Sequence, residues 1–426
     1  MGAILKLSSD KLNNARSGGR WHPGIGANLP QFILLIGVNG LVGALVGQER
    51  SLGSLLGSEV FGVRSAVATL AFVAAFGAAK AVANLAAGAA SDRWGRKPVL
   101  VTGWLLAVPV PALLIVAPSW DWVVAANLLL GVSQGLSWSA TVIMKIDLAG
   151  PRQRGLAAGL NEFAGYLAVA LSAAASGLLA SRYGLRPQPF FLGLAVAGLG
   201  LGLSALLVRE TSPGPNLGAR RDTPAFRTVF ALGSFGDRSL SALSRTGLVN
   251  NANDALAWGL LPLLFAARGL DLRSIGVLAG LYPGVWGVAQ LLTGPLSDRL
   301  GRRPVIALGM WVQALALVWF LLGSGFAGSA AAAVLLGLGT ALVYPALIAA
   351  VGDFSEPGWR AAATGVYRFW RDAGYAIGAV AAGVAADLGG AGAAIGMVAV
   401  VTALSGLDAW LNLARPQPGP LPAFKR

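Results

Sequence analysis

The chain contains no cysteine and a single histidine, His22. Without cysteine it can form neither disulfide bonds nor thiolate metal sites. His22 lies in a polar stretch near the start of the sequence, so no histidine is available as a general base or proton carrier in the apolar part of the chain. A buried proton carrier would have to be a carboxylate, and the candidates are Glu49, Glu162, Asp254 and Asp372.

Charged residues are scarce as well. Only 12% of the 426 residues are Asp, Glu, Lys or Arg, whereas 55% are hydrophobic. Soluble domains carry roughly 25% charged residues, so a soluble fold of this composition would expose too much apolar surface. The apolar residues form runs of about 18 or more, the length that ~30 Å of hydrocarbon requires of a helix. The composition therefore predicts a helical membrane protein.

The apolar runs predict twelve membrane-spanning helices, an even number that places both ends of the chain on one side of the membrane. The stretch before the first run is polar and basic and lacks the apolar core of a signal peptide. The expected helices cover 31–58, 64–90, 98–117, 121–146, 155–180, 188–208, 240–266, 274–297, 304–324, 329–351, 361–386 and 391–414.

Acidic residues are few relative to basic ones, with 18 Asp and Glu against 32 Lys and Arg and a net charge of +14. On the twelve-helix topology most of the Lys and Arg fall on the side of the two chain ends. This is the positive-inside bias of cytoplasmic loops, and it explains the charge without nucleic acid as a partner. We expect cytoplasmic tails at 1–30 and 415–426, helical halves at 31–208 and 240–414, and a polar cytoplasmic linker at 209–239.

The chain repeats itself at an offset of 206 residues, over two stretches of each half. Because this offset contains an even number of helices, the two halves have the same orientation. They are then related by an axis along the membrane normal, as parallel repeats are. The matched pairs include Gly88 and Gly294, Asp92 and Asp298, Arg93 and Arg299, Gly95 and Gly301, Arg96 and Arg302, Asp147 and Asp353, and Arg154 and Arg360.

Two strings in this repeat, GAASDRWGRKP (88–98) and GPLSDRLGRRP (294–304), lie between the second and third and between the eighth and ninth expected helices. Both resemble the Gly-x-x-x-Asp-(Arg/Lys)-x-Gly-(Arg/Lys)-(Arg/Lys) loop of the major facilitator superfamily, and the resemblance covers nearly the whole chain. It implies an all-α membrane fold of twelve helices in two six-helix halves. It also implies a bacterial secondary transporter that works by alternating access.

The resemblance assigns a gating role to these loops. Asp92 is expected to meet the amino end of the eleventh helix in the outward-open state, and Arg96 to meet Asp147. The first glycine of each loop is expected to allow close helix packing, and the second to allow a tight turn. The candidate gating residues are Gly88, Asp92, Arg93, Gly95, Arg96, Asp147, Gly294, Asp298, Arg299, Gly301 and Arg302, together with Lys80 and Asp372.

The chain departs from the family pattern at two places that bear on the expected transport mechanism. Many members carry an Arg four residues before a Gly in the fourth helix, whereas this chain has Asn127 there. The fifth helix also lacks the proline of the Gly-Pro-rich motif of drug/proton antiporters. Proton coupling through that Arg and multidrug antiport are both disfavoured.

Charges inside the expected helices mark candidate functional sites, because an ionised group at membrane depth costs several kcal/mol. Glu49 and Asp254 occupy nearly equivalent places in the two halves, and Asn250 shares a helix face with Asp254. Lys145 and Asp147 are expected to reach water at a helix end. The candidates for substrate binding or ion coupling are Glu49, Arg50, Asn250, Asp254, Glu162, Arg368 and Arg371.

Glu162 coincides with Arg368 at the repeat offset, so the halves differ in charge at an equivalent place. Arg368 and Arg371 could receive a carboxylate or phosphate bidentately. A purely structural polar network is an equal alternative. The aromatic residues Trp138, Trp258, Trp286, Tyr282, Tyr344 and Trp370 could line a pocket or simply pack.

Lys80 and Asp372 are each twelve residues from a cytoplasmic helix end, so they share a depth of about 18 Å. The second and eleventh helices face each other in this superfamily, and we expect an ion pair between these residues. At the offset they correspond to Trp286 and Tyr166, which predicts a neutral aromatic contact at the other interface. Binding of an anionic substrate by Lys80 is the alternative.

The expected function is secondary transport of a small polar or anionic organic solute across the inner membrane, coupled to protons or another cation. Drug efflux by proton antiport and a receptor or scaffold without transport are the alternatives. The string GVSQG (131–135) lies in mid-helix without a base, and no phosphate-binding loop is present, so we expect neither an enzyme nor a primary pump. The expected partners are the bilayer, the solute and a coupling cation, for a monomer without cofactor or metal.

Overall fold

The computed structural model describes residues 24–150, 153–212, 224–356 and 358–414, and all regular structure within them is helical. The first half contains α2 (Leu29–Leu55), α3 (Ala66–Thr69), α4 (Ala71–Trp94), α5 (Arg96–Ala107), α6 (Pro109–Val116), α7 (Trp120–Ala149), α8 (Arg154–Tyr183) and α9 (Gln188–Leu206). The second contains α10 (Phe226–Ala231), α11 (Arg238–Gly259), α12 (Leu261–Ala267), α13 (Leu272–Leu300), α14 (Arg302–Leu322), α15 (Gly325–Asp353) and α16 (Arg360–Asn412).

These helices make twelve membrane crossings. Ten helical segments of the described chain are long and apolar enough to span a bilayer. One of them, α16, has 53 residues and bends at Gly390, whose φ of 78° is outside the helical region, so it crosses twice. The remaining crossing is α11 with α12. This crossing is less apolar than the others, because α11 carries the buried polar residues Asn250, Asn251, Asn253 and Asp254.

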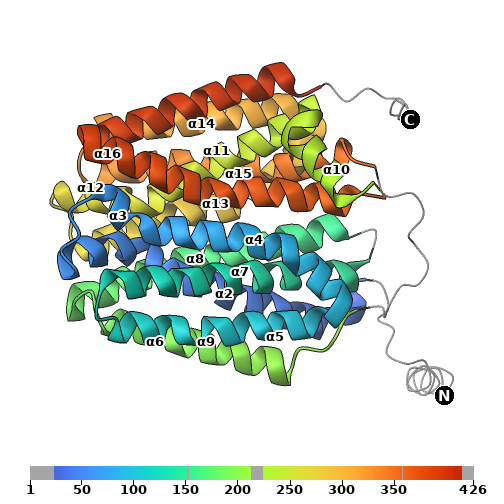
Figure 1. Ribbon diagram of the computed structural model, residues 1–426, viewed down its shortest axis with the longest axis horizontal. Coiled ribbons are helices and arrows are strands. Elements are labelled where there is room, and N and C mark those ends of the chain that lie inside the picture. The colour runs from blue at the N-terminus through green and yellow to red at the C-terminus, as the bar shows by residue number, and fades with distance from the viewer. Residues whose placement is uncertain (1–23, 151–152, 213–223, 357, 415–426) are drawn as a thin grey trace, which may run out of the picture.

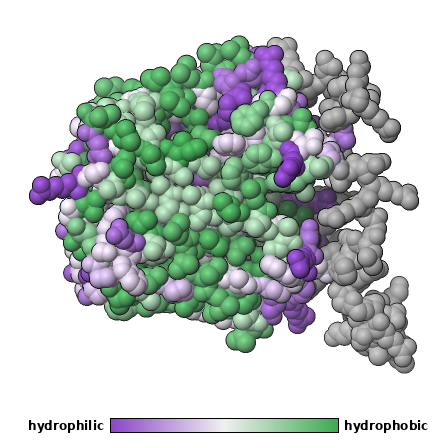
Figure 2. Space-filling model, in the orientation of Figure 1, coloured by the Kyte–Doolittle hydropathy of each residue, from purple (hydrophilic) through white to green (hydrophobic). Residues whose placement is uncertain are grey.

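The two halves lie side by side, with α2 to α9 in the lower part of Figure 1 and α11 to α16 in the upper part. The main contacts between them join α8 to α13 and α4 to α16. Large apolar side chains such as Leu292 and Val82 are exposed on the outside. In Figure 2 the middle of the visible face is mostly hydrophobic and polar residues gather toward both ends, as a bilayer requires.

We call the end of the molecule that contains α10 and the turns at Gly95 and Gly301 the linker end, and the end that contains α3 and α12 the far end. The linker end is on the right of Figure 1 and the far end on the left. The membrane crossings run between these two ends.

The two repeated loops have the same structure at the linker end. Gly95 and Gly301 have φ values of 94° and 89°, which confirms the tight turns, because other residues rarely adopt them. In the first loop Arg96 lies 3.3 Å from Asp147 and 3.0 Å from Asp92. In the second, Arg302 makes the equivalent contacts with Asp353 at 3.0 Å and Asp298 at 2.5 Å. The expected pairing of Arg96 with Asp147 is confirmed.

The expected role of the first loop glycines is wrong for this structure. No heavy atom lies within 4 Å of the position that a Cβ would take at Gly88 or Gly294. Close helix packing occurs instead at Gly177 of α8 and Gly276 of α13, where a Cβ would come within 2.7 Å of the other glycine. The interface between the halves therefore depends on glycines that the loop motif does not contain.

Candidate functional site

The two halves meet at mid-depth through one charged and one aromatic contact. The Lys80 ammonium of α4 lies 3.5 Å from the Asp372 carboxylate of α16. At the equivalent place the rings of Tyr166 in α8 and Trp286 in α13 have centroids 3.6 Å apart. The ion pair was expected from the shared depth and the family resemblance and the aromatic contact from the repeat, and both are confirmed.

Asp372 is enclosed by donors from both halves. Besides Lys80, the carboxylate has the Arg371 guanidinium at 3.6 Å and the Asn251 amide at 3.5 Å. The Asn84 amide of α4 donates to its other oxygen. The side chain is only 2% exposed, so these donors replace water around a buried charge.

A small polar cavity lies beside this cluster. Its lining carries three cationic side chains, from Lys80, Arg368 and Arg371, but a single carboxylate, that of Asp372. The Arg371 guanidinium lies 4.2 Å from the centre of the Tyr344 ring and donates to the Tyr166 hydroxyl at 3.3 Å. The complete lining is Lys80, Asn84, Trp138, Tyr166, Tyr344, Arg368, Arg371 and Asp372.

Glu162 lies behind the aromatic part of this lining. Its carboxylate accepts hydrogen bonds from the Trp138 indole at 2.8 Å and from the Tyr344 hydroxyl at 3.0 Å. Because Tyr344 belongs to the second half, this bond also joins the halves. The offset relation of Glu162 and Arg368 thus places opposite charges around the same cavity.

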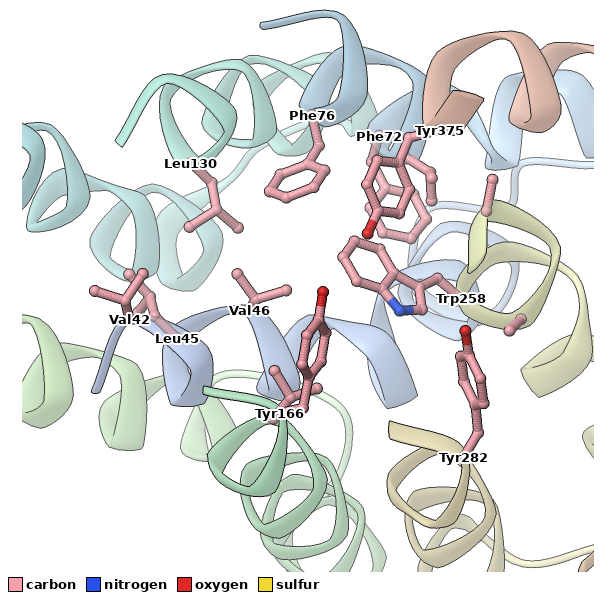
Figure 3. Close-up of a cluster of buried hydrophobic side chains, with 14 of the residues drawn as sticks. Val42, Leu45, Val46, Phe72, Phe76, Leu130, Tyr166, Trp258, Tyr282 and Tyr375 are labelled. Carbon is pink, nitrogen blue, oxygen red and sulfur yellow. The ribbon is translucent and has the colours of Figure 1, made fainter. Parts of the chain in front are cut away.

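Asp254 of α11 is held by two tyrosines. The Tyr282 hydroxyl of α13 and the Tyr375 hydroxyl of α16 both donate to its carboxylate, the latter at 2.9 Å. Figure 3 shows Tyr375 and Tyr282 on opposite sides of Trp258. Asp254 is fully buried and does not belong to the lining of the small polar cavity.

The shared helix face of Asn250 and Asp254 suggests that they could present an amide and a carboxylate together, but the two side chains have different partners. The Asn250 carbonyl oxygen accepts a hydrogen bond from Gln313 of α14 at 3.0 Å. Asn253 donates to the same Gln313 side chain at 2.7 Å. Asn250 therefore belongs to a polar network inside the second half, whereas Asp254 is bonded to α13 and α16.

Glu49 and Arg50 lie inside α2, as predicted, with exposures of 4% and 3%. They face different partners, because successive residues on a helix point about 100° apart. The Glu49 carboxyl lies against Asn127 of α7, within its own half. The Arg50 guanidinium lies 3.5 Å from the centre of the Trp258 ring, in the other half.

Lys145 was expected to reach water, and this is wrong. Its side chain is fully buried, and its ammonium donates to the Leu35 carbonyl of α2 at 2.8 Å. It lies a turn deeper than the end of α7 at Ala149, and α2 covers it there. Asp147 does reach solvent, with 23% of its side chain exposed.

The halves are closed at the far end. Asp387 of α16 accepts hydrogen bonds from the Ser65 hydroxyl at 2.7 Å and from the backbone N–H groups of Ala66 and Val67. Next to it, a Cβ at Gly383 would lie 2.6 Å from the Val67 Cα, so the two halves are in tight contact there. We call this contact the far-end latch.

No equivalent of the latch joins the halves at the linker end within the described ranges. The hydrogen bonds that we find between the halves lie at mid-depth or in the far-end latch. Figure 2 shows a hollow between the halves at the linker end. Asp92 is 77% exposed there, and among the described residues its ion-pair partner is Arg96, so its expected contact with the amino end of α16 is not made in this state.

Asn84, Ser139 and Tyr375 take part in the site but were not predicted. The sequence did carry a signal for two of them. Asn84 follows Lys80 by four residues and Tyr375 follows Arg371 by four, so each shares a helix face with a predicted charge. Ser139, which lies 3.5 Å from the Arg368 guanidinium, has no such signal. Trp370, which the sequence offered as a pocket residue, packs away from the cavity on Phe230 and Phe235.

The fold and the site define a multi-pass membrane protein of the two-half transporter class. The family model of the Major Facilitator Superfamily matches residues 31–245 and 243–426, and the chain belongs to this superfamily.

Curated relatives match a part of the chain. Multidrug resistance protein MdtG of Salmonella typhimurium is 28% identical over 244 residues, which cover 56% of this chain and 58% of that protein. Its counterpart from Serratia proteamaculans is 28% identical over 243 residues, covering 56% and 57%. The matched region thus spans little more than half of these relatives.

Solved structures match over nearly the whole length. The nucleoside transporter NupG superimposes with a TM-score of 0.70 at 13% identity, covering 90% of this chain and 98% of that one. The human organic anion transporter MFSD10 superimposes with a TM-score of 0.64 at 19% identity, covering 89% and 99%. At these identities the likeness shows the fold alone.

Proposed function

We propose that this protein is a secondary transporter that moves a small organic anion across the inner membrane by alternating access. The observation that supports it best is the charge of the cavity between the halves, where Lys80, Arg368 and Arg371 face one carboxylate. Asp372 supplies one negative charge against these three cations, and the Nε atom of Arg371 is buried without a hydrogen-bond partner among the described residues. The two arginines therefore keep capacity to bind an anion. A planar guanidinium matches a carboxylate or phosphate bidentately.

The aromatic lining favours an organic anion over an inorganic one. Trp138, Tyr166 and Tyr344 provide apolar ring surface next to the two arginines. Such rings bury carbon atoms of a ligand, while the neighbouring arginines bind its charged end. We therefore expect the anionic group at Arg371 and the carbon skeleton against the rings.

We propose that a proton gradient drives accumulation, with Glu49 and Asp254 as the coupling candidates. One oxygen of the Glu49 carboxyl is buried without a hydrogen-bond partner, which leaves room for a proton. Asp254 is bonded by tyrosines of two different helices, α13 and α16, so its protonation would change a contact that ties these helices together. The described residues contain no histidine, so carboxylates of this kind are the proton carriers available there.

We place the linker end in the cytoplasm. The Lys and Arg residues of the sequence gather in the loops of this end, and the positive-inside rule then fixes the orientation. In that orientation the structure is open toward the cytoplasm and closed toward the periplasm. A small anion would enter or leave from the cytoplasmic side in this state.

Drug efflux is the second candidate, and the name of the curated relatives favours it. Cationic drugs need an acidic partner in the cavity. The single lining carboxylate, Asp372, is engaged by Lys80 and Arg371, and Glu162 is bonded by Trp138 and Tyr344. The charge of the site therefore favours anions over cations.

A thermal-shift screen of the purified protein separates the two candidates, because a ligand that binds the native state raises the Tm. Benzoate and other aromatic carboxylates should stabilise the protein, and Arg371→Gln should abolish the shift. Arg245→Gln is the matched control, since Arg245 is half exposed and pairs with Asp408 away from the cavity. Stabilisation by tetraphenylphosphonium but by none of the anions would refute the proposal in favour of cation efflux.

A further inference from the structure

Arg50 is a buried cation that makes no salt bridge with a carboxylate of the described residues. The residue is 3% exposed, and its Nε and Nη1 atoms are buried without a hydrogen-bond partner. No carboxylate of the described residues lies within 4 Å of its guanidinium. The adjacent Glu49 does not neutralise it, because Glu49 points into the first half toward Asn127. A buried, unpaired charge costs several kcal/mol, so such a site is expected to receive an anion during the working cycle.

A second unused donor lies next to this guanidinium. Arg50 stacks on the Trp258 ring at 3.5 Å, and the Trp258 indole N–H is itself buried without a partner. The indole nitrogen is visible in Figure 3 on the side of the ring that faces Tyr282. Both residues offer donors and no acceptor. What is missing between α2 and α11 is therefore an acceptor, preferably a negatively charged one.

This donor pair is continuous with the polar cavity through stacked rings. The Trp258 ring stacks on the Tyr375 ring, with centroids 5.1 Å apart. The Lys80 ammonium lies 5.4 Å from the centre of the same Tyr375 ring. Lys80 lines the cavity together with Arg371. A short row of contacts thus leads from the cavity to Arg50, and every contact in it crosses or borders the interface between the halves.

We infer that Arg50 and Trp258 form a second anion-binding point, and that the transported substrate is an organic dianion. One carboxylate or phosphoryl group binds at Arg371, and the other accepts hydrogen bonds from the Arg50 guanidinium and the Trp258 indole. The carbon skeleton between them lies along the aromatic stack. This inference rests on the proposed function, because it deepens the substrate class of the same site.

The same arrangement gives the second anionic group a part in the conformational cycle. Arg50 belongs to the first half and Trp258 to the second, so an anion bound by both side chains joins the halves. A monoanion held only at Arg371 would not make this contact. Dianions should therefore stabilise the protein more than monoanions of equal chain length.

The test uses the purified full-length protein and matched pairs of ligands: α,ω-dicarboxylates from malonate to suberate, and the monocarboxylate of each chain length. Kd values come from calorimetry or thermal shift. For wild type, at least one dicarboxylate should bind about tenfold or more tightly than its monocarboxylate partner. Arg50→Met should remove this preference and keep monocarboxylate binding. Trp258→Phe, which keeps the ring and removes the N–H, should reduce the preference in part.

Two readouts distinguish binding from a structural role. Without ligand, Arg50→Met should have the same Tm as wild type or a higher one, because it removes an unpaired buried charge. Arg245→Met serves as the control and should leave both Kd values unchanged, since Arg245 lies thirteen residues before Trp258, about 20 Å along α11.

The possible results separate this inference from the proposed function. If the preference for dicarboxylates survives Arg50→Met, the second binding point is refuted while the proposed anion transport stands. A marked loss of Tm in ligand-free Arg50→Met has the same consequence, because it indicates a structural role for Arg50. Equal binding of mono- and dicarboxylates by wild type would also overturn it. Failure of every anion to bind, with Arg371→Gln behaving like wild type, would instead remove the proposed function itself.

Discussion

Lys80 of α4 and Asp372 of α16 form an ion pair of 3.5 Å that joins the two halves at mid-depth, where each side chain is less than 10% exposed. The pair has no charged counterpart at the other interface, where the Tyr166 ring contacts the Trp286 ring. Breaking one partner of a buried pair leaves an unpaired charge, which typically costs about 3–5 kcal/mol. We therefore expect the two interfaces between the halves, α4 with α16 and α8 with α13, to respond differently to substitution.

We predict that Lys80→Ala and Asp372→Ala each abolish most transport and lower the Tm. The charge swap, Lys80→Asp with Asp372→Lys, should restore part of both, because it re-forms the pair in reverse. The measurement is a double-mutant cycle on Tm and on uptake into liposomes, with an expected coupling of about 1–3 kcal/mol. Additive effects of the two alanine substitutions would refute the pair and favour anion binding by Lys80.

The proposed coupling residues give a second prediction. Glu49→Gln and Asp254→Asn keep the shape of each side chain and remove its ability to carry a proton. At least one of them should abolish accumulation driven by a pH gradient while exchange of labelled for unlabelled substrate continues. Liposome uptake and exchange assays check both activities on the same preparation. If both variants still accumulate substrate normally in response to a pH gradient, the coupling role is refuted and a structural role for these carboxyl groups remains.

Glu210, near the start of the linker that follows α9, gives a prediction about pH. Partial burial raises the pKa of its carboxyl, but backbone N–H groups of Ser212, Lys97, Arg96 and Thr211 donate to it and hold the pKa below its ordinary value of 4.5. A lowered pKa in the folded state contributes stability above the unfolded pKa, and this contribution is lost as the pH falls through the folded pKa.

We therefore expect Glu210→Gln to lower the free energy of unfolding at pH 7 by less than about 1 kcal/mol, because this carboxylate is largely exposed and screened. The Tm should be slightly lower than that of wild type. The difference from wild type should shrink below pH 4.5. Melting curves across this range measure it, with Glu59→Gln at the far end as the control. A Tm difference that does not depend on pH would assign the effect to packing alone.

The sequence predicted the fold, the repeated loops and both interface contacts, because these follow from spacing along the chain. A residue's depth in the membrane follows from its distance to a helix end. This depth, together with the family resemblance that makes the second and eleventh helices neighbours, placed Lys80 beside Asp372. The direction of a side chain around its helix axis depends on tertiary packing, which spacing does not define. The misjudged surroundings of Asn250, Lys145 and Gly88 are all errors of this kind.

The membrane orientation gives a fourth prediction, and the natural absence of cysteine makes it direct to test. Ser212→Cys, at the linker end, should react with an impermeant maleimide only from the cytoplasmic side. Ser119→Cys, in the turn before α7 at the far end, should react only from the periplasmic side. Ser8 lies outside the described residues, and Ser8→Cys should behave like Ser212→Cys. Labelling of Ser119→Cys from the cytoplasm would reverse the orientation.

The far-end latch gives the last prediction. The Asp387 carboxylate of α16 accepts hydrogen bonds from the Ser65 hydroxyl and from two backbone N–H groups at the amino end of α3, where a negative charge is favoured. Since α3 and α16 belong to different halves, these bonds exist only while the far end is closed. Their loss should stabilise the far-end-open state relative to the present one.

We predict that Asp387→Ala increases opening at the far end, because the charge-assisted hydrogen bonds that its carboxylate accepts across the two halves are lost. The measurement is the labelling rate of Ser139→Cys, beside the cavity, by an impermeant maleimide added at the far end. Asp271→Ala is the matched control: Asp271 also caps a helix at this end, but it accepts from Ser274 within its own half and joins no halves. Equal labelling rates in the two variants would show that the latch does not hold the far end closed, and that packing of Gly383 on Val67 suffices.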